Sequence, residues 1–174
     1  MQIPLVLTVV GRDRPGLVES IARIIAARGG NWLESRMCRL GGEFAGILRI
    51  RVDSSEEKAL QEELQALQAQ GLGVTVCPAR NEPERPAGQI VALELVGQDR
   101  PGIVRDISHA LASQGVNVED LVTECTSAPM SGETLFKAKA LLQLPPSCPV
   151  AGLRNQLERV AGNLLVDVVL QEVK

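Results

Sequence analysis

The fold of this chain is decided by the loop Gly11-Arg12-Asp13-Arg14-Pro15-Gly16, which returns 86 residues later as Gly97-Gln98-Asp99-Arg100-Pro101-Gly102. Around this loop, residues 7–34 align with residues 93–120 without a gap, and 12 of the 28 paired positions are identical. Self-similarity at a constant offset is typical of a duplicated structural unit. We therefore expect two similar domains, residues 1–79 and 89–174, joined by a linker at residues 80–88.

The composition is that of an ordinary globular protein. Of the 174 residues, 45% are hydrophobic and 22% are charged, so both halves carry enough apolar side chains to fold. The net charge of −3 gives no general attraction to phosphate backbones, which disfavours direct nucleic-acid binding. No apolar run is long enough to span a membrane, and the first residues lack the features of a signal peptide. We expect a cytoplasmic protein without membrane contact.

The sequence offers little for catalysis. The four cysteines contain no C-x-x-C pair and do not occupy equivalent repeat positions, which argues against a zinc site and against a disulfide framework. The single histidine, His109, falls on a predicted helix and is expected at the surface. Without a nucleophile and base pair, a metal-ligand spacing or a Walker-type glycine loop, we expect a protein that is not an enzyme and holds neither cofactor nor metal.

Hydrophobic periodicity assigns the same order of elements to both repeats. In the first repeat we expect strands at residues 3–10, 31–40, 44–52 and 72–77. Its helices are expected to run from Pro15 to the residue before Gly29, and from a capping box at residues 54–57 to Gly71. In the second repeat we expect strands at residues 90–96, 117–125, 134–144 and 164–170, and helices at residues 101–114 and 149–161.

Only the hairpin differs between the repeats. Gly41-Gly42 makes a tight turn in the first copy, whereas the match of Gly42-Glu43 to Gly132-Glu133 at an offset of 90 predicts a four-residue extension around residues 127–131 in the second. The order βαββαβ with right-handed crossovers gives an α+β, ferredoxin-like domain. We expect two of them in tandem, each a four-stranded antiparallel sheet with two helices on one face.

The repeated loop is the candidate ligand site. It leads from a strand into a helix, whose first N–H groups are unpaired and attract anions, while Asp13 and Asp99 add negative charge beside them. A free amino acid carries both charges, so its carboxylate fits the amides and its ammonium fits the aspartate. The predicted ligand-binding residues are Gly11, Asp13, Arg14, Pro15, Gly16 and Asn31 in the first copy, and Gly97, Asp99, Arg100, Pro101, Gly102 and Asn117 in the second.

The same residues also fit a purely structural role. On that reading Asp13 and Asp99 cap the helix, the prolines start it, and the glycines make the turn. The loop alone leaves this alternative open.

The loop with its D-R-P-G-[LI]-V pattern, followed by an alanine-rich helix, glycine and asparagine, resembles the ACT domain in both copies. This resemblance implies a ferredoxin-like module that binds small effectors, often amino acids. The stretch from Asn31 to Phe44, together with the tandem layout, is similar to the glycine cleavage system transcriptional repressor family. That similarity implies a regulator that holds a DNA-binding activator inactive through protein contact, and a hold that glycine relieves.

Trp32, Glu34 and Arg36 lie in this stretch and are the candidate partner contacts, although Trp32 also fits a core anchor. In the second copy Trp32-Leu33-Glu34-Ser35-Arg36 is replaced by Val118-Glu119-Asp120-Leu121-Val122. The sequence therefore leaves open whether one loop or both bind a ligand.

Three other functions share parts of this pattern. A stand-alone amino-acid-binding regulator of a metabolic enzyme is the main alternative. An acylphosphatase-like phosphohydrolase would use the loop arginines to grip phosphate, but the aspartates oppose an anion and the motif of that family is absent. An RNA-binding sheet is disfavoured because the chain has no Tyr, two Phe and one Trp. Arg49, Arg51, Lys137 and Lys139 are expected to form a basic, outward-facing stripe.

Small four-stranded sheets leave edge strands exposed. We therefore expect the two halves to pack as an internal pseudo-dimer with the ligand loops near the seam, and two chains to associate as a homodimer.

Overall fold

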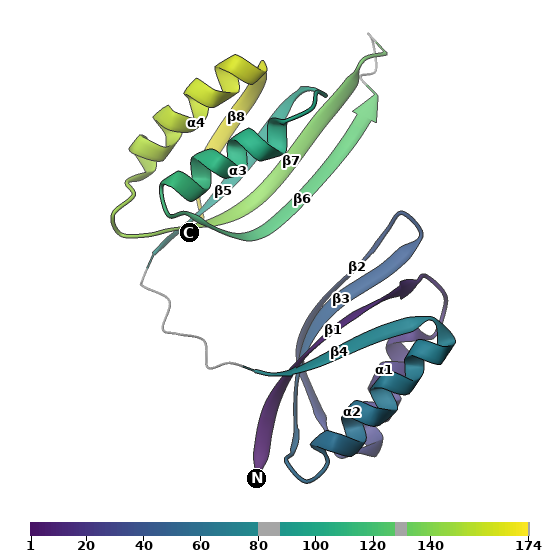
Figure 1. The fold of residues 1–174 in the computed structure, drawn as a ribbon. Coiled ribbons are helices and arrows are strands. Elements are labelled where there is room, and N and C mark those ends of the chain that lie inside the picture. Colours follow the sequence, from purple (N-terminus) through teal and green to yellow (C-terminus); the bar gives the residue numbers. More distant parts are fainter. Residues whose placement is uncertain (80–87, 128–131, 174) are drawn as a thin grey trace. The chain divides into compact units, whose positions relative to one another are not determined.

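The computed structural model describes residues 1–79, 88–127 and 132–173. Its helices and strands form two compact units, each with its own sheet and its own core (Figure 1). Of the predicted linker at residues 80–88, only Gly88 belongs to the described residues. Most of the predicted hairpin extension lies outside them as well. None of the described helices is long and apolar enough to cross a membrane.

The first unit is a sheet covered on one face by two helices (Figure 1). Its strands are antiparallel and lie in the order β2-β3-β1-β4. Its elements are β1 (Gln2–Arg12), α1 (Leu17–Ala27), β2 (Asn31–Leu40), β3 (Glu43–Asp53), α2 (Glu57–Ala66), the 3-10 helix η1 (Leu67–Gln70) and β4 (Leu72–Pro78). Leu5, Leu7 and Val9 of β1 are buried while the residues between them are more exposed, so alternate side chains of the strand form the core under the helices.

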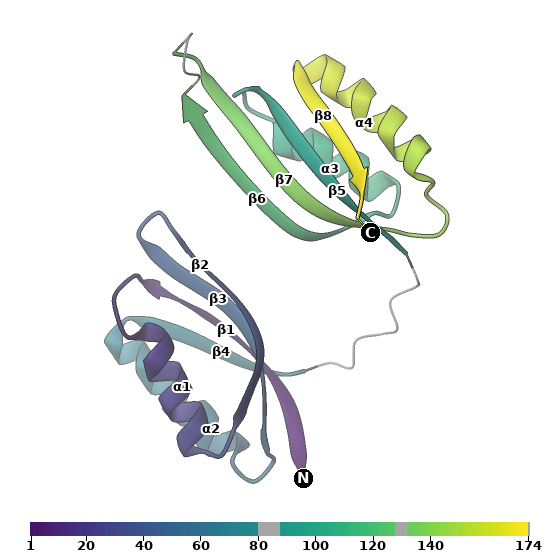
Figure 2. The ribbon, with the colours of Figure 1, turned by 180° about the vertical axis from the view of Figure 1, so that it is seen from behind.

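The second unit repeats this arrangement with strand order β6-β7-β5-β8. Its elements are β5 (Gln89–Gln98), α3 (Ile103–Ser113), β6 (Asn117–Ser127), β7 (Thr134–Leu144), α4 (Val150–Leu164) and β8 (Val166–Glu172). Figure 2 shows the face of this sheet that no helix of the unit covers. The predicted α+β architecture of two tandem ferredoxin-like βαββαβ domains is confirmed.

The first helix of each unit begins two residues later than the sequence predicts. Pro15 and Pro101 are not the first helical residues, because α1 begins at Leu17 and α3 at Ile103. The intervening glycines, Gly16 and Gly102, adopt φ values of 90° and 99°, which no right-handed helix contains. Each proline therefore lies in the turn that precedes the helix.

The predicted capping box at the start of α2 is also wrong. The residue at the N-cap is Glu56, and its side chain makes no capping hydrogen bond. Instead, Oδ1 of Asp53 at the end of β3 accepts hydrogen bonds from the Ser55 N–H (3.1 Å) and the Ser55 hydroxyl (2.9 Å). The chain is turned into the helix by this aspartate, one residue before the predicted motif.

The hairpin extension of the second unit is six residues rather than four. Gly11 of β1 pairs with Phe44 of β3, and Gly97 of β5 pairs with Phe136 of β7. The offset is therefore 86 residues between the first strands and 92 between the third. The matching Gly-Glu dipeptides do not occupy equivalent positions, because strand pairing rather than local identity sets the register.

Candidate functional site

The two β–α loops share one backbone geometry. Gly16 and Gly102 are the N-cap residues of α1 and α3, and no side chain caps either helix. The Asp13 N–H donates a 2.9 Å hydrogen bond to the Gly42 carbonyl, and the Asp99 N–H donates one of 2.9 Å to the Thr134 carbonyl. Each loop is thus tied to the adjoining hairpin while the first-turn N–H groups lack a side-chain acceptor, which is a geometry suited to an anion.

Gly11 and Gly97 have a structural role in packing the last strand of each unit. A Cβ on Gly11 would clash with the Gly71 carbonyl oxygen, and one on Gly97 would lie 2.8 Å from Cα of Val166. Both glycines therefore allow the last strand of the unit to approach closely.

The carboxylate of Asp13 does not cap α1 but pairs with an arginine. Its Oδ2 atom lies 2.6 Å from Nε of Arg39, which is a residue of β2. Arg39 faces Phe44 in the strand register, and the residue that faces the equivalent Phe136 is Cys125. The second unit therefore lacks the matching arginine, and its Asp99 is exposed with no ion pair in the part of the chain that the structure describes.

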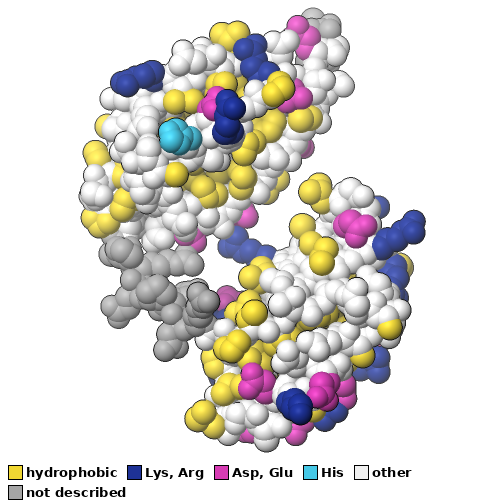
Figure 3. All heavy atoms as spheres, in the orientation of Figure 1, with side chains coloured by type: hydrophobic (Ala, Val, Ile, Leu, Met, Phe, Trp, Pro, Cys, Tyr) yellow, Lys and Arg dark blue, Asp and Glu magenta, His cyan; other side chains and the backbone are white. Residues whose placement is uncertain are grey.

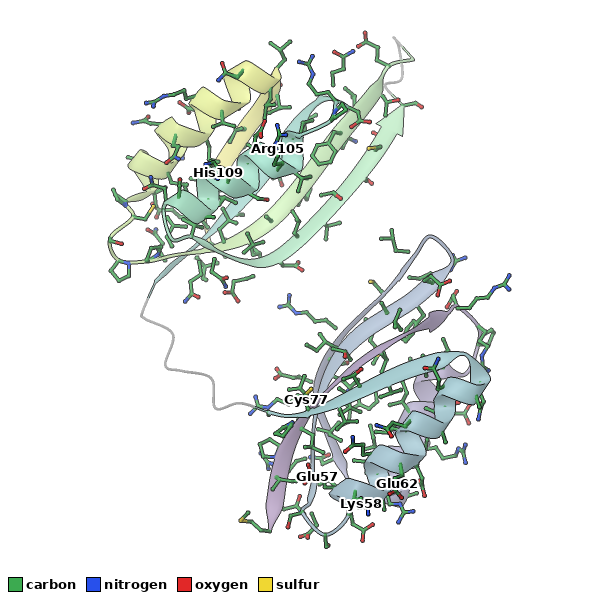
Figure 4. All side chains as sticks on the ribbon, in the orientation of Figure 1. Glu57, Lys58, Glu62, Cys77, Arg105 and His109 are labelled. Atoms are coloured by element: carbon green, nitrogen blue, oxygen red, sulfur yellow. The ribbon has the colours of Figure 1, made fainter. Side chains whose placement is uncertain are left out.

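The first turn of the helix differs in charge as well. Oε2 of Glu19 lies 3.9 Å from the place where a Cβ on Gly16 would be, whereas Nη2 of Arg105 lies 3.1 Å from that place on Gly102. Arg105 is also 2.7 Å from Oδ1 of Asp106, and this hydrogen bond lowers the pKa of the Asp106 carboxyl. Figure 4 shows Arg105 on α3, one turn before His109, which is exposed as predicted.

The loops are therefore not equivalent. In the first, the aspartate is neutralised by Arg39 and a glutamate stands beside the helix N-terminus. In the second, Asp99 is exposed and the ion pair of Arg105 with Asp106 lies beside the helix N-terminus. Sequence reasoning missed both arginines, although Glu19 and Arg105 form the one pair of opposite charges in the aligned segments.

The remaining loop residues make few contacts with side chains. Nη2 of Arg14 donates to the Gln70 carbonyl (3.3 Å), and Nη2 of Arg100 donates to Oε1 of Gln98 (3.3 Å). These two arginines hold the loop to neighbouring residues of the same unit.

The structure does not bring the predicted asparagines to the loops. Asn31 pairs with Arg51, which pairs with Pro4, seven residues before Gly11 on β1. Seven residues of strand span about 20 Å. Asn117 stands at the same remote end of the second sheet and donates to Oε1 of Glu119 (2.5 Å). The sequence placed both asparagines wrongly because it located them by order along the chain, whereas the intervening helix returns to the far end of the sheet.

The three candidate partner contacts do not share a face. Trp32 lies opposite the buried Ile50 and is half-buried against the first core, as a core anchor would be. Glu34 and Arg36 lie opposite Arg49 and Ile47, so they occupy the sheet face without helices.

The predicted basic stripe is largely neutralised. Arg49 pairs with Glu34 at 3.3 Å, Lys137 with Glu124 at 3.8 Å and Lys139 with Glu94 at 3.3 Å. Within the described ranges, no group of three metal-ligating side chains lies together.

A family model for the ACT domain matches residues 4–77 and again residues 89–171. The chain belongs to the ACT domain family. Its two ACT domains account for nearly the whole chain and coincide with the two compact units.

Relatives share the tandem layout of these ACT domains. The glycine cleavage system transcriptional repressor of Escherichia coli (strain K12) is 25% identical over 164 residues, which cover 92% of this chain and 85% of that protein. An unknown protein from Galdieria sulphuraria has a solved structure that is 29% identical and superposes over the full length of both chains with a TM-score of 0.89. A candidate glycine cleavage system transcriptional repressor shares the fold, with a TM-score of 0.73 at 20% identity over 100% of this chain and 99% of that one. This tandem ACT protein is therefore a regulatory protein similar to the glycine cleavage repressor.

Proposed function

We propose that this protein is a non-enzymatic amino-acid sensor, with glycine as the first candidate effector, that restrains a DNA-binding activator through protein contact. The observation that carries the proposal is the similarity to the Escherichia coli repressor, which runs through both ACT domains instead of a single module. That similarity also covers 85% of the repressor's own length, as expected for two proteins that consist of the same pair of domains.

The charges of the second loop support a zwitterionic ligand there. The exposed carboxylate of Asp99 suits an ammonium group, and the N–H groups at the N-terminus of α3, which no side chain caps, suit a carboxylate. In the first loop, the carboxylate of Asp13 is already paired with Arg39. We therefore propose the second ACT domain as the effector domain.

Thermal unfolding against a panel of amino acids tests the ligand. An effector that binds only the folded state raises the melting temperature, and the shift grows with the logarithm of its concentration above Kd. Glycine is expected to do so, and Asp99→Asn is expected to weaken glycine binding about 10- to 100-fold, because a lost charge-assisted hydrogen bond costs about 1.5–3 kcal/mol.

Asp13→Asn is the matched control, since it changes the equivalent aspartate of the other loop, and glycine affinity should stay within about twofold. A glycine effect that is insensitive to Asp99→Asn but lost in Asp13→Asn would assign the effector to the first domain. No shift with any amino acid would remove the sensor function.

Affinity capture from the native extract tests the partner. The wild-type protein is expected to retain a DNA-binding transcription factor, identified by mass spectrometry, and to release it on addition of glycine. Asp99→Asn should retain the factor with or without glycine. Capture of a metabolic enzyme in place of a transcription factor would support the alternative, a regulator of that enzyme.

A further inference from the structure

The second domain contains an apolar pocket between α3 and the edge strand β6. It is a partly open hollow whose empty space, counted together with the open solvent at its mouth, amounts to about 400 Å³. Buried Leu93, Ile107 and Phe136 lie at its floor, while Val118 and Leu121 stand at its rim, 39% and 48% exposed. Figure 3 shows the apolar side chains gathered on this side of the unit. Exposed apolar rims around a concave site are typical of ligand pockets.

In the first domain, larger side chains occupy part of the equivalent space. Trp32 stands where Val118 stands in the second domain, since both face the equivalent core residues of the neighbouring strand. Trp32 and Met37 are both half-buried and pack against the first core.

Two more positions add to this difference in volume. Met37 is replaced by Thr123, and Met37 lies over Gly46, since Cγ of Met37 is 2.6 Å from the place of a Cβ on that glycine. Leu48, fully buried in the first core, is replaced by Ala140. The second domain therefore lacks an indole ring, a thioether and a larger aliphatic chain at this site, and Leu121 in place of Ser35 and Ala138 in place of Gly46 offset only part of that volume.

We propose that this pocket is a binding site for a neutral, largely apolar small molecule of about the size of a bicyclic aromatic ring. The first domain gives the dimensions, because its own indole fills the same site against the same backbone. The lining contains no charged side chain, and its polar groups are the hydroxyls of Ser108 and Thr123. A charged group would be buried there without a partner at a large cost, whereas a single N–H or O–H can bond to a hydroxyl.

Indole is the probe for the test, added to the full chain and followed by ligand-observed NMR and by calorimetric titration. The wild type is expected to bind one indole per chain. The double variant Val118→Trp with Thr123→Met restores the side chains of the first domain and should weaken indole binding at least 10-fold. Val122→Trp is the matched control, because Val122 lies next to Thr123 on β6 but on the opposite face of the sheet, and its affinity should match the wild type.

Circular dichroism establishes that each variant is folded. If the double variant does not fold, Ala140→Leu fills the pocket from β7 and should weaken indole binding to a similar extent. If the wild-type chain does not bind indole, the proposal is wrong. The same conclusion holds if indole cannot enter because another part of the chain or a second copy covers the pocket. Equal affinity in the filled variant overturns it as well. Glycine binding through Asp99 is a separate measurement, so the two proposals fail independently.

Discussion

Gly102 is the residue on which the second loop turns. Its φ of 99° lies in a region that costs a residue with a side chain about 1–2 kcal/mol. We expect Gly102→Ala to lower the free energy of unfolding of the second domain by about that amount. Urea unfolding followed by far-UV circular dichroism measures it.

Gly162 provides the control for this substitution. It lies in α4 with no atom within 4 Å of the place of its Cβ. Alanine is favoured over glycine in a helix, so Gly162→Ala should stabilise the domain by about 0.5–1 kcal/mol. If the two substitutions change the free energy of unfolding equally, the positive φ at Gly102 does not disfavour a residue with a side chain.

Asp53 makes the first domain sensitive to acid. Hydrogen bonds from the Ser55 N–H, the N-terminal ammonium and the Ser55 hydroxyl lower the pKa of its carboxyl from 3.8 to about 2. Because the folded pKa is depressed, this contribution to stability is present above pH 3.8 and is lost as the pH falls through about 2. We expect Asp53→Asn to flatten the pH dependence of the urea midpoint in this window. Parallel curves for wild type and variant would show that Asp53 makes no such contribution.

The sequence could single out the loop as the candidate site but could not tell its two copies apart. Asp13 and Asp99 stand in nearly identical local sequences, and their difference comes from position 39 and its counterpart, Cys125. Those residues lie on another strand and reach the loop only through the sheet. A contact between residues distant in sequence is not encoded in a local motif, so the arginine that neutralises Asp13 was beyond prediction.

At the level of elements, hydrophobic periodicity predicted every helix and strand, because burial on one face constrains each position along an element. The starts of the helices were less predictable. Pro15 satisfies the rule for the first helical position, but the left-handed Gly16 after it delays α1. The hairpin was predicted with the wrong length because a two-residue match outside the strands carries no information on register.

The register difference predicts that the long hairpin of the second domain is dispensable for folding. The Gly41-Gly42 turn, with φ values of 61° and 87°, joins the equivalent strands of the first domain directly. Replacing residues 127–134 by Gly-Gly should leave the stability of the second domain unchanged or slightly raised, since shortening a loop lowers its closure entropy. Thermal unfolding of the shortened protein measures this. If the shortened protein loses more than about 1 kcal/mol of unfolding free energy, the extension makes contacts that stabilise the domain by more than its loop-closure entropy costs.

At the scale of the whole molecule, the two domains have separate cores but comparable uncovered sheet faces. Val10 and Ile47 are 56% and 49% exposed on the first sheet, and Val122 and Val169 are 60% and 44% exposed on the second. Apolar side chains gathered on a face are typical of a surface that another surface covers. The internal pseudo-dimer expected from the sequence stays a prediction, and it requires that the stability of one domain depends on the other.

The single tryptophan makes this dependence measurable. Trp32 packs against the first core, so its fluorescence reports unfolding of the first domain. Leu64→Ala removes a fully buried side chain of that core. It should lower the free energy of unfolding measured by Trp32 fluorescence by about 2–5 kcal/mol. Leu157→Ala makes the same change in the second core. If the domains stabilise each other, Leu157→Ala also lowers the free energy of unfolding measured by Trp32 fluorescence, by less than Leu64→Ala does. In the opposite outcome, Leu157→Ala changes only the unfolding of the second domain, seen by circular dichroism, and leaves the Trp32 fluorescence transition where it is in the wild type. The domains then unfold independently, which excludes the pseudo-dimer, because an interface that stabilises both domains makes unfolding of one destabilise the other.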